Sequence, residues 1–249
     1  MANPIVITGA SSGIGEACAL AFAKLGRELI LGARRDKKLA GVAAACRLAG
    51  APQVTALPLD VRSLESINAF AAAANPLEPE VLINNAGLAK GRDTVAALRD
   101  DDLTAMVDTN VTGFLRVARA ILPGMIARKQ GHVVTLGSLA GREVYEGGAV
   151  YCATKFAVKA VTSALRLELS GTNIRVTEIA PGAVETEFSI VRTGDVAKAK
   201  AVYQGLVPLT AVDIADCVTW AVTRPPHVNI GEIVLTCVAQ SAITKFHRT

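Results

Sequence analysis

The stretch PIVITGASSGIGE, residues 4–16, decides the fold of this chain. Pro4–Thr8 is a short, continuous apolar run of the kind that a parallel sheet buries on both faces. A glycine-rich turn follows it, and a helical pattern then runs from Glu16 to Leu25. A strand, a glycine turn and a helix in this order begin a βαβ unit, in which the turn can bind the pyrophosphate of a dinucleotide.

The three glycines of this turn have different expected roles. Gly9 permits a tight turn, whereas Gly13 and Gly15 let the backbone come close to a pyrophosphate at the positive end of the helix. A plain glycine loop is the alternative. The strand before the turn and the helix after it favour dinucleotide binding.

The second expected strand, Glu28–Gly32, ends in Ala33, Arg34 and Arg35. An NAD site usually has an acidic residue about 20 residues past the glycines, where it binds the ribose hydroxyls. Ala33 stands in that place, and the two arginines after it suit a 2′-phosphate. The sequence therefore predicts NADP. Two solvated arginines are the alternative, which the positive end of the following helix disfavours.

Strands and helices alternate along the rest of the chain. Further strands are expected at Gln53–Leu59, Glu80–Ile83, Gly131–Ser138, Ile174–Ile179 and Glu232–Cys237, and further helices at Lys37–Leu48, Asp101–Arg128, Ala149–Ser170 and Ala211–Val222. This alternation predicts right-handed crossovers and one doubly wound parallel sheet of the α/β class. With no linker or repeat in view, we expect one domain over residues 1–249.

The composition limits the class of protein. Apolar residues make up 51% of the chain and aromatic residues only 4%, so the large core must be aliphatic. The net charge of +4 is small and its Lys and Arg are scattered, which argues against nucleic acid and suits anionic small molecules. No apolar run is long enough to cross a bilayer, and no signal peptide precedes the first strand. Five cysteines without metal-ligand spacing indicate reduced thiols in a cytoplasmic protein that binds no metal.

Polar residues stand where the expected strands end, which is the edge where parallel sheets bind ligands. Asp60 accepts a hydrogen bond from an adenine amino group, or it caps the helix that starts near Ser63. Asn84 and Asn85 brace the irregular backbone after the fourth strand, and Gly87 lets the chain pass close to a ligand.

Asn110 lies in the long expected helix, which Gly113 weakens shortly afterwards. A distorted turn around Asn110 that holds a water is one interpretation, and a core asparagine bonded to backbone is the other. Ser138 ends the fifth strand and so emerges at the ligand-binding edge.

Tyr151 and Lys155 stand one helical turn apart, so their side chains project from the same face. A nearby positive charge favours the phenolate and lowers the pKa of a tyrosine. Bringing that pKa from about 10 to near neutrality takes roughly 3 units, or about 4 kcal/mol. One ammonium together with a positively charged cofactor ring supplies this only in a site shielded from water. In such a site Tyr151 is a general acid/base for an alcohol or carbonyl oxygen. A tyrosine beside a solvated lysine is the alternative.

Together these residues resemble the short-chain dehydrogenase/reductases over nearly the whole chain. The motifs that carry the resemblance are Thr8–Gly15, Asn84–Gly87, Asn110, Ser138, Tyr151 with Lys155, and Pro181-Gly182. The resemblance implies a seven-stranded Rossmann sheet, NADP-dependent oxidoreductase chemistry on a small molecule, and assembly into homotetramers.

The resemblance also implies a role for each matching residue. Ser138 would hold the substrate oxygen, Tyr151 would exchange the alcohol proton, and Lys155 would bind the nicotinamide ribose and lower the Tyr151 pKa. Asn110 would keep a water that links Lys155 to solvent, and Thr186 would hold the carboxamide. The other implied cofactor contacts are Gly9, Ser11, Ser12, Gly13, Ile14, Gly15, Arg34, Arg35, Asp60, Val61, Asn85, Ala86, Gly87, Pro181, Gly182 and Val184.

A narrower likeness lies further along the chain. Pro181–Ser189, Val191-Arg192 and Pro226–Ile230 resemble an NADP-dependent branch of the family that acts on 3-hydroxy acids, including serine and allo-threonine. The family's usual Val-Asp-Gly-Gly before the last strand is absent, and Gly231–Val234 stands there instead. This departure agrees with the branch.

A 3-hydroxy acid needs a cation for its carboxylate. Arg142 follows Ser138, and Arg192 lies in residues 183–205, which we expect to form a flexible substrate lid. We favour Arg192, with a surface arginine as the alternative for Arg142. A carbonyl reductase of uncharged ketones or aldehydes would use the same residues. A non-catalytic NADP-binding protein is the third function, which the complete catalytic set argues against.

Overall fold

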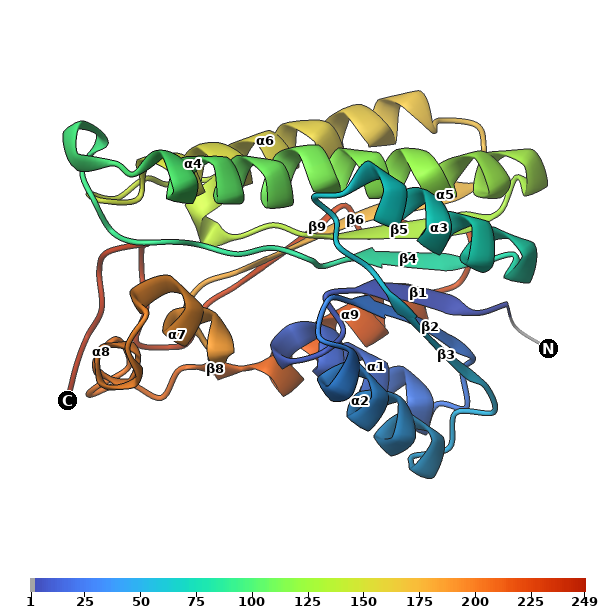
Figure 1. Cartoon of the computed structure of the whole chain (residues 1–249), viewed down its shortest axis with the longest axis horizontal. Coiled ribbons are helices and arrows are strands. Elements are labelled where there is room, and N and C mark those ends of the chain that lie inside the picture. The colour runs from blue at the N-terminus through green and yellow to red at the C-terminus, as the bar shows by residue number, and fades with distance from the viewer. Residues whose placement is uncertain (1–2) are drawn as a thin grey trace.

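Seven parallel strands form one sheet at the centre of the molecule (Figure 1). The computed structural model describes residues 3–249, and the strand order is β3-β2-β1-β4-β5-β6-β9. The strands are β1 (Ile5–Thr8), β2 (Leu29–Ala33), β3 (Val54–Pro58), β4 (Val81–Asn84), β5 (Gly131–Leu136), β6 (Ile174–Pro181) and β9 (Glu232–Leu235). Every neighbouring pair is parallel, which confirms the predicted doubly wound sheet.

Helices cover both faces of this sheet (Figure 1). One face carries α1 (Gly13–Lys24), α2 (Asp36–Leu48) and α9 (Ala211–Val222). The other carries α3 (Leu64–Ala74), α5 (Phe114–Arg128) and α6 (Ala149–Glu168). An apolar sheet covered on both faces buries β1, β2, β4 and β5 completely, as their continuous apolar sequences predicted, whereas the edge strands β3 and β9 stay partly exposed.

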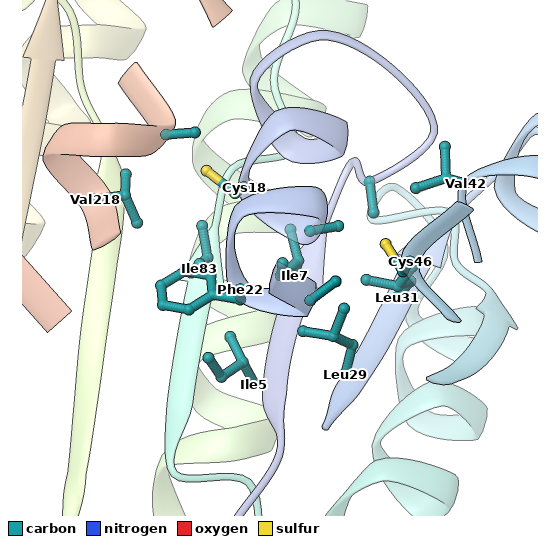
Figure 2. Close-up of a cluster of buried hydrophobic side chains, with 14 of the residues drawn as sticks. Ile5, Ile7, Cys18, Phe22, Leu29, Leu31, Val42, Cys46, Ile83 and Val218 are labelled. Atoms are coloured by element: carbon teal, nitrogen blue, oxygen red, sulfur yellow. The ribbon is translucent and has the colours of Figure 1, made fainter. Parts of the chain in front are cut away.

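The period of two along each strand divides the core into two layers. Ile5 and Ile7 of β1 belong to the layer under α1 and α9, whereas Val6 between them belongs to the opposite layer. Figure 2 shows the first layer, in which Phe22 of α1 and Val218 of α9 lie over the strands. These packed layers make the sheet edge a rigid base for a binding site.

The long helix predicted over Asp101–Arg128 is interrupted in its middle. α4 (Asp100–Val107) leads into a π-helical turn, residues 108–113, and then into α5. A Cβ on Gly113 would lie 2.6 Å from the carbonyl oxygen of Val61, so glycine is needed for this close approach. The distorted turn expected around Asn110 is therefore present, and π-helical turns of this kind often occur at functional sites.

Residues 183–205, expected to be a flexible stretch, contain regular structure. They hold β7 (Val184–Glu185), α7 (Glu187–Thr193) and α8 (Val196–Ala201), and β7 pairs in parallel with β8 (Leu209–Thr210). The side chains of Thr186 and Asp195 cap the two short helices, which is why these elements form. Figure 1 shows α7 and α8 side by side, far from the N-terminus.

The five cysteines are all free thiols, as predicted. No helix within residues 3–249 is both long enough and apolar enough to span a membrane. Over the same part of the chain, no cluster of three or more His, Cys, Asp or Glu side chains is arranged to hold a metal ion.

Candidate active site

A cavity of about 980 Å³ opens at the carboxyl edge of the sheet, and residues that follow both β1 and β4 line it. The chain order reverses between these two neighbouring strands, and doubly wound sheets bind ligands at such a switch point. All the predicted site residues line this cavity except Gly15, Asn110 and Arg142.

The turn between β1 and α1 forms one wall of the cavity. Gly9 and Gly13 have φ angles of 67° and 58°, in the left-handed region that glycine adopts without strain. Gly15 packs against the same turn, because a Cβ there would lie 2.5 Å from the carbonyl oxygen of Gly9. The backbone at the start of α1 is therefore open to an anion, as binding of a pyrophosphate requires.

Arg35 connects three parts of the cavity wall. Its Nε donates to the Ser11 hydroxyl at 3.2 Å, and one terminal nitrogen donates to the Ser12 hydroxyl. Its other terminal nitrogen pairs with Glu187 of α7 at 2.8 Å, and Lys38 pairs with the same carboxylate at 2.5 Å. Hydrogen bonds from Lys38 and Arg35 lower the pKa of Glu187 to about 2. The end of β2 is thus linked to the segment that was expected to form the lid.

The residues at this end of the cavity fit an NADP cofactor. Ala33 is buried at the position where NAD sites carry an acid, and Arg34 and Arg35 line the cavity next to it. A glycine cradle and a pair of guanidinium groups in one cavity match the pyrophosphate and the additional phosphate of NADP.

Asp60 lines the cavity at the end of β3, but it does not cap the following helix. The cap of α3 is Ser63, whose hydroxyl accepts a hydrogen bond from the backbone N–H of Ser66 at 3.2 Å. The carboxylate of Asp60 accepts one from the backbone N–H of Arg62 at 3.0 Å. The alternative of an Asp60 cap is therefore wrong, because the serine directly before the helix takes that place.

Asn84 and Asn85 brace the backbone as expected. The side-chain amide of Asn84 donates to the carbonyl oxygen of Phe114 at 2.9 Å, and that of Asn85 donates to the carbonyl oxygen of Thr8 at 2.9 Å. The Thr8 hydroxyl in turn accepts from the backbone N–H groups of Asn85 and Ala86. The bonds between Thr8 and the Asn85-Ala86 segment hold β1 and β4 together at the mouth of the cavity, whereas the Asn84 bond joins β4 to α5.

Asn110 in the π-helical turn is hydrogen-bonded through both ends of its side-chain amide. Its Oδ1 accepts from the backbone N–H of Leu88 at 2.9 Å. Its Nδ2 donates to the carbonyl oxygen of Leu88 at 2.8 Å and to the Thr154 hydroxyl at 3.0 Å. A buried amide of this kind must be satisfied. The side chain therefore joins the loop after β4 to α6, next to Lys155.

Ser138, Tyr151 and Lys155 lie together in the cavity wall. Ser138 follows β5, and its hydroxyl accepts from the backbone N–H of Ala140 at 3.1 Å. Tyr151 and Lys155 come from the start of α6 and both face the cavity, as their spacing predicts. The Nζ of Lys155 donates to the carbonyl oxygen of Leu136 at 2.7 Å.

The protein groups by themselves do not lower the pKa of Tyr151. Burial raises that pKa, and the opposing hydrogen bond from Ser138 does not offset it. Lys155 Nζ lies 5.9 Å from the centre of the Tyr151 ring, and burial lowers its own pKa to about 8. In the protein alone, desolvation of the phenol exceeds the opposing effects of Ser138 and Arg192. The prediction also counted the positive charge of the cofactor ring, so the lowered pKa of Tyr151 in the complex stays a prediction.

Comparison with known proteins assigns the chain to a family. The family described as short chain dehydrogenase matches residues 3–195. The chain belongs to this family. The predicted resemblance is confirmed, and with it the parallel sheet that the motifs implied.

Relatives of this short-chain dehydrogenase match it over nearly its whole length. An NADP-dependent 3-hydroxy acid dehydrogenase of Schizosaccharomyces pombe is 45% identical over 235 residues, which cover 93% of this chain and 91% of that protein. A sulfoacetaldehyde reductase of Chromohalobacter salexigens is 42% identical, with 97% of each chain covered. Among solved structures, the closed form of serine dehydrogenase complexed with NADP+ has a TM-score of 0.92 at 38% identity, covering 99% of this chain and 100% of that one.

Near Tyr151, the dehydrogenase brings side chains of α7 to the cavity. The guanidinium of Arg192 lies 5.7 Å from the centre of the Tyr151 ring and 5.2 Å from that of Tyr145. Arg192 Nε also donates to the carbonyl oxygen of Gly91 at 3.2 Å. The Phe188 ring lies 5.6 Å from that of Tyr151. A cation and an aromatic side chain thus lie beside the predicted acid/base.

Tyr145 is a cavity residue that the sequence analysis missed. Its hydroxyl is buried and has no hydrogen-bond partner within the described residues, and burial raises its pKa. The guanidinium of Arg92 lies 5.9 Å from the Tyr145 ring. Its position between Ser138 and Tyr151 was the one available signal, because a segment that joins two site residues tends to pass close to the site.

Arg142 lies outside the cavity lining of the dehydrogenase. Its two terminal nitrogens donate to the carboxylate of Glu178 on β6 at 3.1 and 3.0 Å. It also pairs with Glu232 of β9 at 2.7 Å. The expectation that Arg142 binds a substrate carboxylate is therefore corrected, because protein carboxylates already hold its guanidinium.

Proposed function

We propose that this dehydrogenase is an NADP-dependent oxidoreductase that interconverts a 3-hydroxy acid, serine-like in size, and its 3-oxo product. The observation that carries the proposal is the guanidinium of Arg192 at 5.7 Å from the Tyr151 ring. A substrate whose hydroxyl reaches Tyr151 can then place its carboxylate against a fixed cation. The similarity to the 3-hydroxy acid dehydrogenase of Schizosaccharomyces pombe and to the solved serine dehydrogenase supports the same substrate class.

NADP, when bound, accepts or returns the hydride, and the side chains of the chain handle the proton and the substrate. In oxidation Tyr151 takes the hydroxyl proton of the substrate, and in reduction it donates a proton to the carbonyl oxygen. The Ser138 hydroxyl holds that same oxygen. Lys155 as an ammonium favours the phenolate form of Tyr151 and binds the nicotinamide ribose. Asn110 keeps a water that connects Lys155 to solvent, as the family resemblance implies.

Residues 183–205 form the substrate lid in this proposal, within one domain that spans the chain. α7 carries both Phe188 and Arg192 to the Tyr151 ring, so movement of α7 would open or close the substrate end. We also propose a cytoplasmic homotetramer. Free cysteines support the compartment, and large apolar side chains exposed on α5 and α6, such as Leu115 and Phe156, support association. Light scattering of the purified protein tests the assembly.

The direct test of the function is turnover. Purified protein with NADP and L-serine or 3-hydroxypropanoate should give NADPH, measured by its near-ultraviolet absorbance. The same assay with NAD should be much slower. Absence of turnover with every 3-hydroxy acid would remove the proposed substrate class.

A second candidate is reduction of an aldehyde that carries an anionic group, because a sulfonate would meet Arg192 as a carboxylate does. The relative named sulfoacetaldehyde reductase favours it. Reductase activity on uncharged ketones, in contrast, would leave Arg192 unused. Rates of NADPH oxidation with a panel of carboxylate, sulfonate and uncharged carbonyl compounds distinguish these three candidate functions.

Arg192→Ala is expected to lower kcat/KM for serine by roughly 10- to 100-fold, because a charge-assisted pair with the carboxylate is lost. For a neutral secondary alcohol the loss should be about threefold at most, since only packing on Tyr151 changes. Arg192→Lys is the matched control and should recover part of the activity on serine. An equal loss on both substrates would remove the idea of a carboxylate clamp.

Oxidation is expected to accelerate with pH. Because burial raises the pKa of Tyr151, its phenolate is scarce at neutrality and increases about tenfold per pH unit. The increase should level off above about pH 8, where Lys155 begins to lose its proton. Reduction needs the phenol and the ammonium, so it should be level below about pH 8 and fall above it. A rate of oxidation that does not change between about pH 6 and about pH 10 would contradict these assignments.

A further inference from the structure

A fully buried carboxylate lies behind the catalytic wall. Glu178 of β6 is 0% exposed, and its partner Arg142 is 13% exposed in its side chain. Both carboxylate oxygens accept from Arg142, at 3.1 and 3.0 Å. Burying such a pair costs several kcal/mol of desolvation per ion, and hydrophobic residues of the same size are often as stable. The pair therefore adds little to the stability of the fold, which suggests that it has another role.

The pair contacts the turn that carries Ser138. A Cβ on Gly137 would collide with the Glu178 carboxylate, so the carboxylate packs directly against the Gly137 backbone. Arg142 also donates to the carbonyl oxygen of Ser138 at 3.4 Å. On the other side, Lys155 Nζ donates to the carbonyl oxygen of Leu136 at 2.7 Å. Three consecutive residues thus touch Lys155, Glu178 and Arg142 in turn.

Glu178 also acts on Lys155 through its charge. Lys155 is 8% exposed, and burial disfavours its ammonium form. Glu178 opposes that effect and raises the pKa of Lys155. The other titratable or charged groups around these two are Tyr151, Tyr145, Cys152, Lys159 and Arg166 from or next to α6, Arg142 from the loop after β5, Glu232 from β9 and Arg192 from α7.

We propose that Glu178, held by Arg142, is a positioning residue that fixes the Leu136–Ser138 turn and keeps Lys155 in its charged form. The carboxylate supplies the negative charge that a buried ammonium needs, and Arg142 holds that carboxylate against Gly137. This role rests on the proposed function, because it acts through Lys155.

The test is the pH profile of Glu178→Gln, which preserves shape and removes the charge. The pH dependence of the reduction of 3-oxopropanoate by NADPH follows the loss of the proton from Lys155. Tyr151 loses its proton only at higher pH, because burial raises its pKa. In Glu178→Gln, the pH at which kcat/KM begins to fall on the alkaline side should be lower than in the unmodified protein by about half a unit or more. A purely structural role would lower kcat/KM by the same factor at every pH, and that result overturns the proposal.

Two further variants serve as controls. Glu178→Asp keeps the charge, so its pH profile should stay close to that of the unmodified protein even where kcat falls. Glu232→Gln removes a carboxylate from the same arginine, but this side chain is 38% exposed and water screens it. Its shift should be smaller than that of Glu178→Gln. An equal or larger shift for Glu232→Gln would reject the specific role of Glu178.

Glu178→Gln leaves Arg142 with one carboxylate fewer, which can prevent folding. In that case the double variant Glu178→Gln with Arg142→Gln removes both charges and leaves neither ion unpaired. Its profile should still shift downward, because Glu178 raises the Lys155 pKa. The shift should be smaller than in Glu178→Gln, because the positive charge of Arg142 is removed as well. An unmoved profile in this folded variant counts against the proposal.

Binding of NADPH provides a readout that needs no turnover. Lys155 binds the ribose as an ammonium, so the pH at which affinity falls should shift with Glu178→Gln as the rate does. Inactive unmodified protein would refute the proposed substrate, while a binding profile unmoved by Glu178→Gln would refute the role of Glu178. The two failures are therefore distinguishable.

Discussion

Tyr151→Phe is expected to lower kcat for oxidation by roughly 10³-fold or more, because the proton acceptor proposed for the substrate hydroxyl is removed. The phenyl ring keeps the packing against Phe188, whose ring lies 5.6 Å away. Affinity for NADP, measured by fluorescence titration of NADPH, should therefore change by less than about threefold. The combination of intact binding and lost turnover is the signature of a missing acid/base.

Tyr145→Phe is the matched control for this experiment. It removes another buried hydroxyl in the same cavity, beside the same Arg192. If Tyr145 only helps to orient the substrate, kcat/KM should fall by about tenfold at most, since one hydrogen bond is lost. A Tyr151→Phe variant that retains more than about a tenth of its turnover would mean that a different group exchanges the proton.

The double variant Ala33→Asp with Arg34→Ser is expected to change the ratio of kcat/KM for NADP over NAD by roughly 10²-fold or more. The new carboxylate binds the ribose hydroxyls of NAD and repels the 2′-phosphate, and one phosphate-binding guanidinium is lost. Arg35 is left in place because it also bonds Ser11, Ser12 and Glu187. Initial rates with both cofactors at one fixed substrate concentration give the ratio.

Ala33→Asn with the same Arg34→Ser separates charge from shape. It has nearly the volume of the aspartate variant but adds no negative charge, so it should weaken NADP without improving NAD to the same degree. NADP preference that survives both double variants would show that the guanidinium groups at the end of β2 do not select the phosphate.

The fold could be predicted where local patterns and topology agree. Residues 4–16 contain the strand, the turn glycines and the helix start in one continuous segment, so no distant contact was needed to recognise them. The π-helical turn was only partly visible, because Gly113 indicated a weakness but its cause is the carbonyl oxygen of Val61 on another element. The helices of residues 183–205 were missed because their caps at Thr186 and Asp195 are single short polar residues.

The site residues also fall into a group that the sequence predicted and a group that it did not. The residues for the nucleotide lie at strand ends, and the parallel topology brings those ends together. The substrate end is different, because Tyr145, Arg92 and Arg192 come from three separate segments that only the folded chain brings together. Arg142 was misassigned because its real partners, Glu178 and Glu232, lie far away in sequence and gave no local signal.

The contact between Glu187 and the cations at the end of β2 has a consequence for any measurement on this enzyme. Glu187, Arg35 and Lys38 have side chains between 41% and 51% exposed, so mobile ions in the buffer reach them. At an ionic strength of about 0.1 M the screening length is only about 10 Å, and it shortens further as salt is added. Added salt should therefore weaken both the hold on α7 and the attraction for the 2′-phosphate. Rates and affinities compared between variants carry meaning only at one fixed ionic strength.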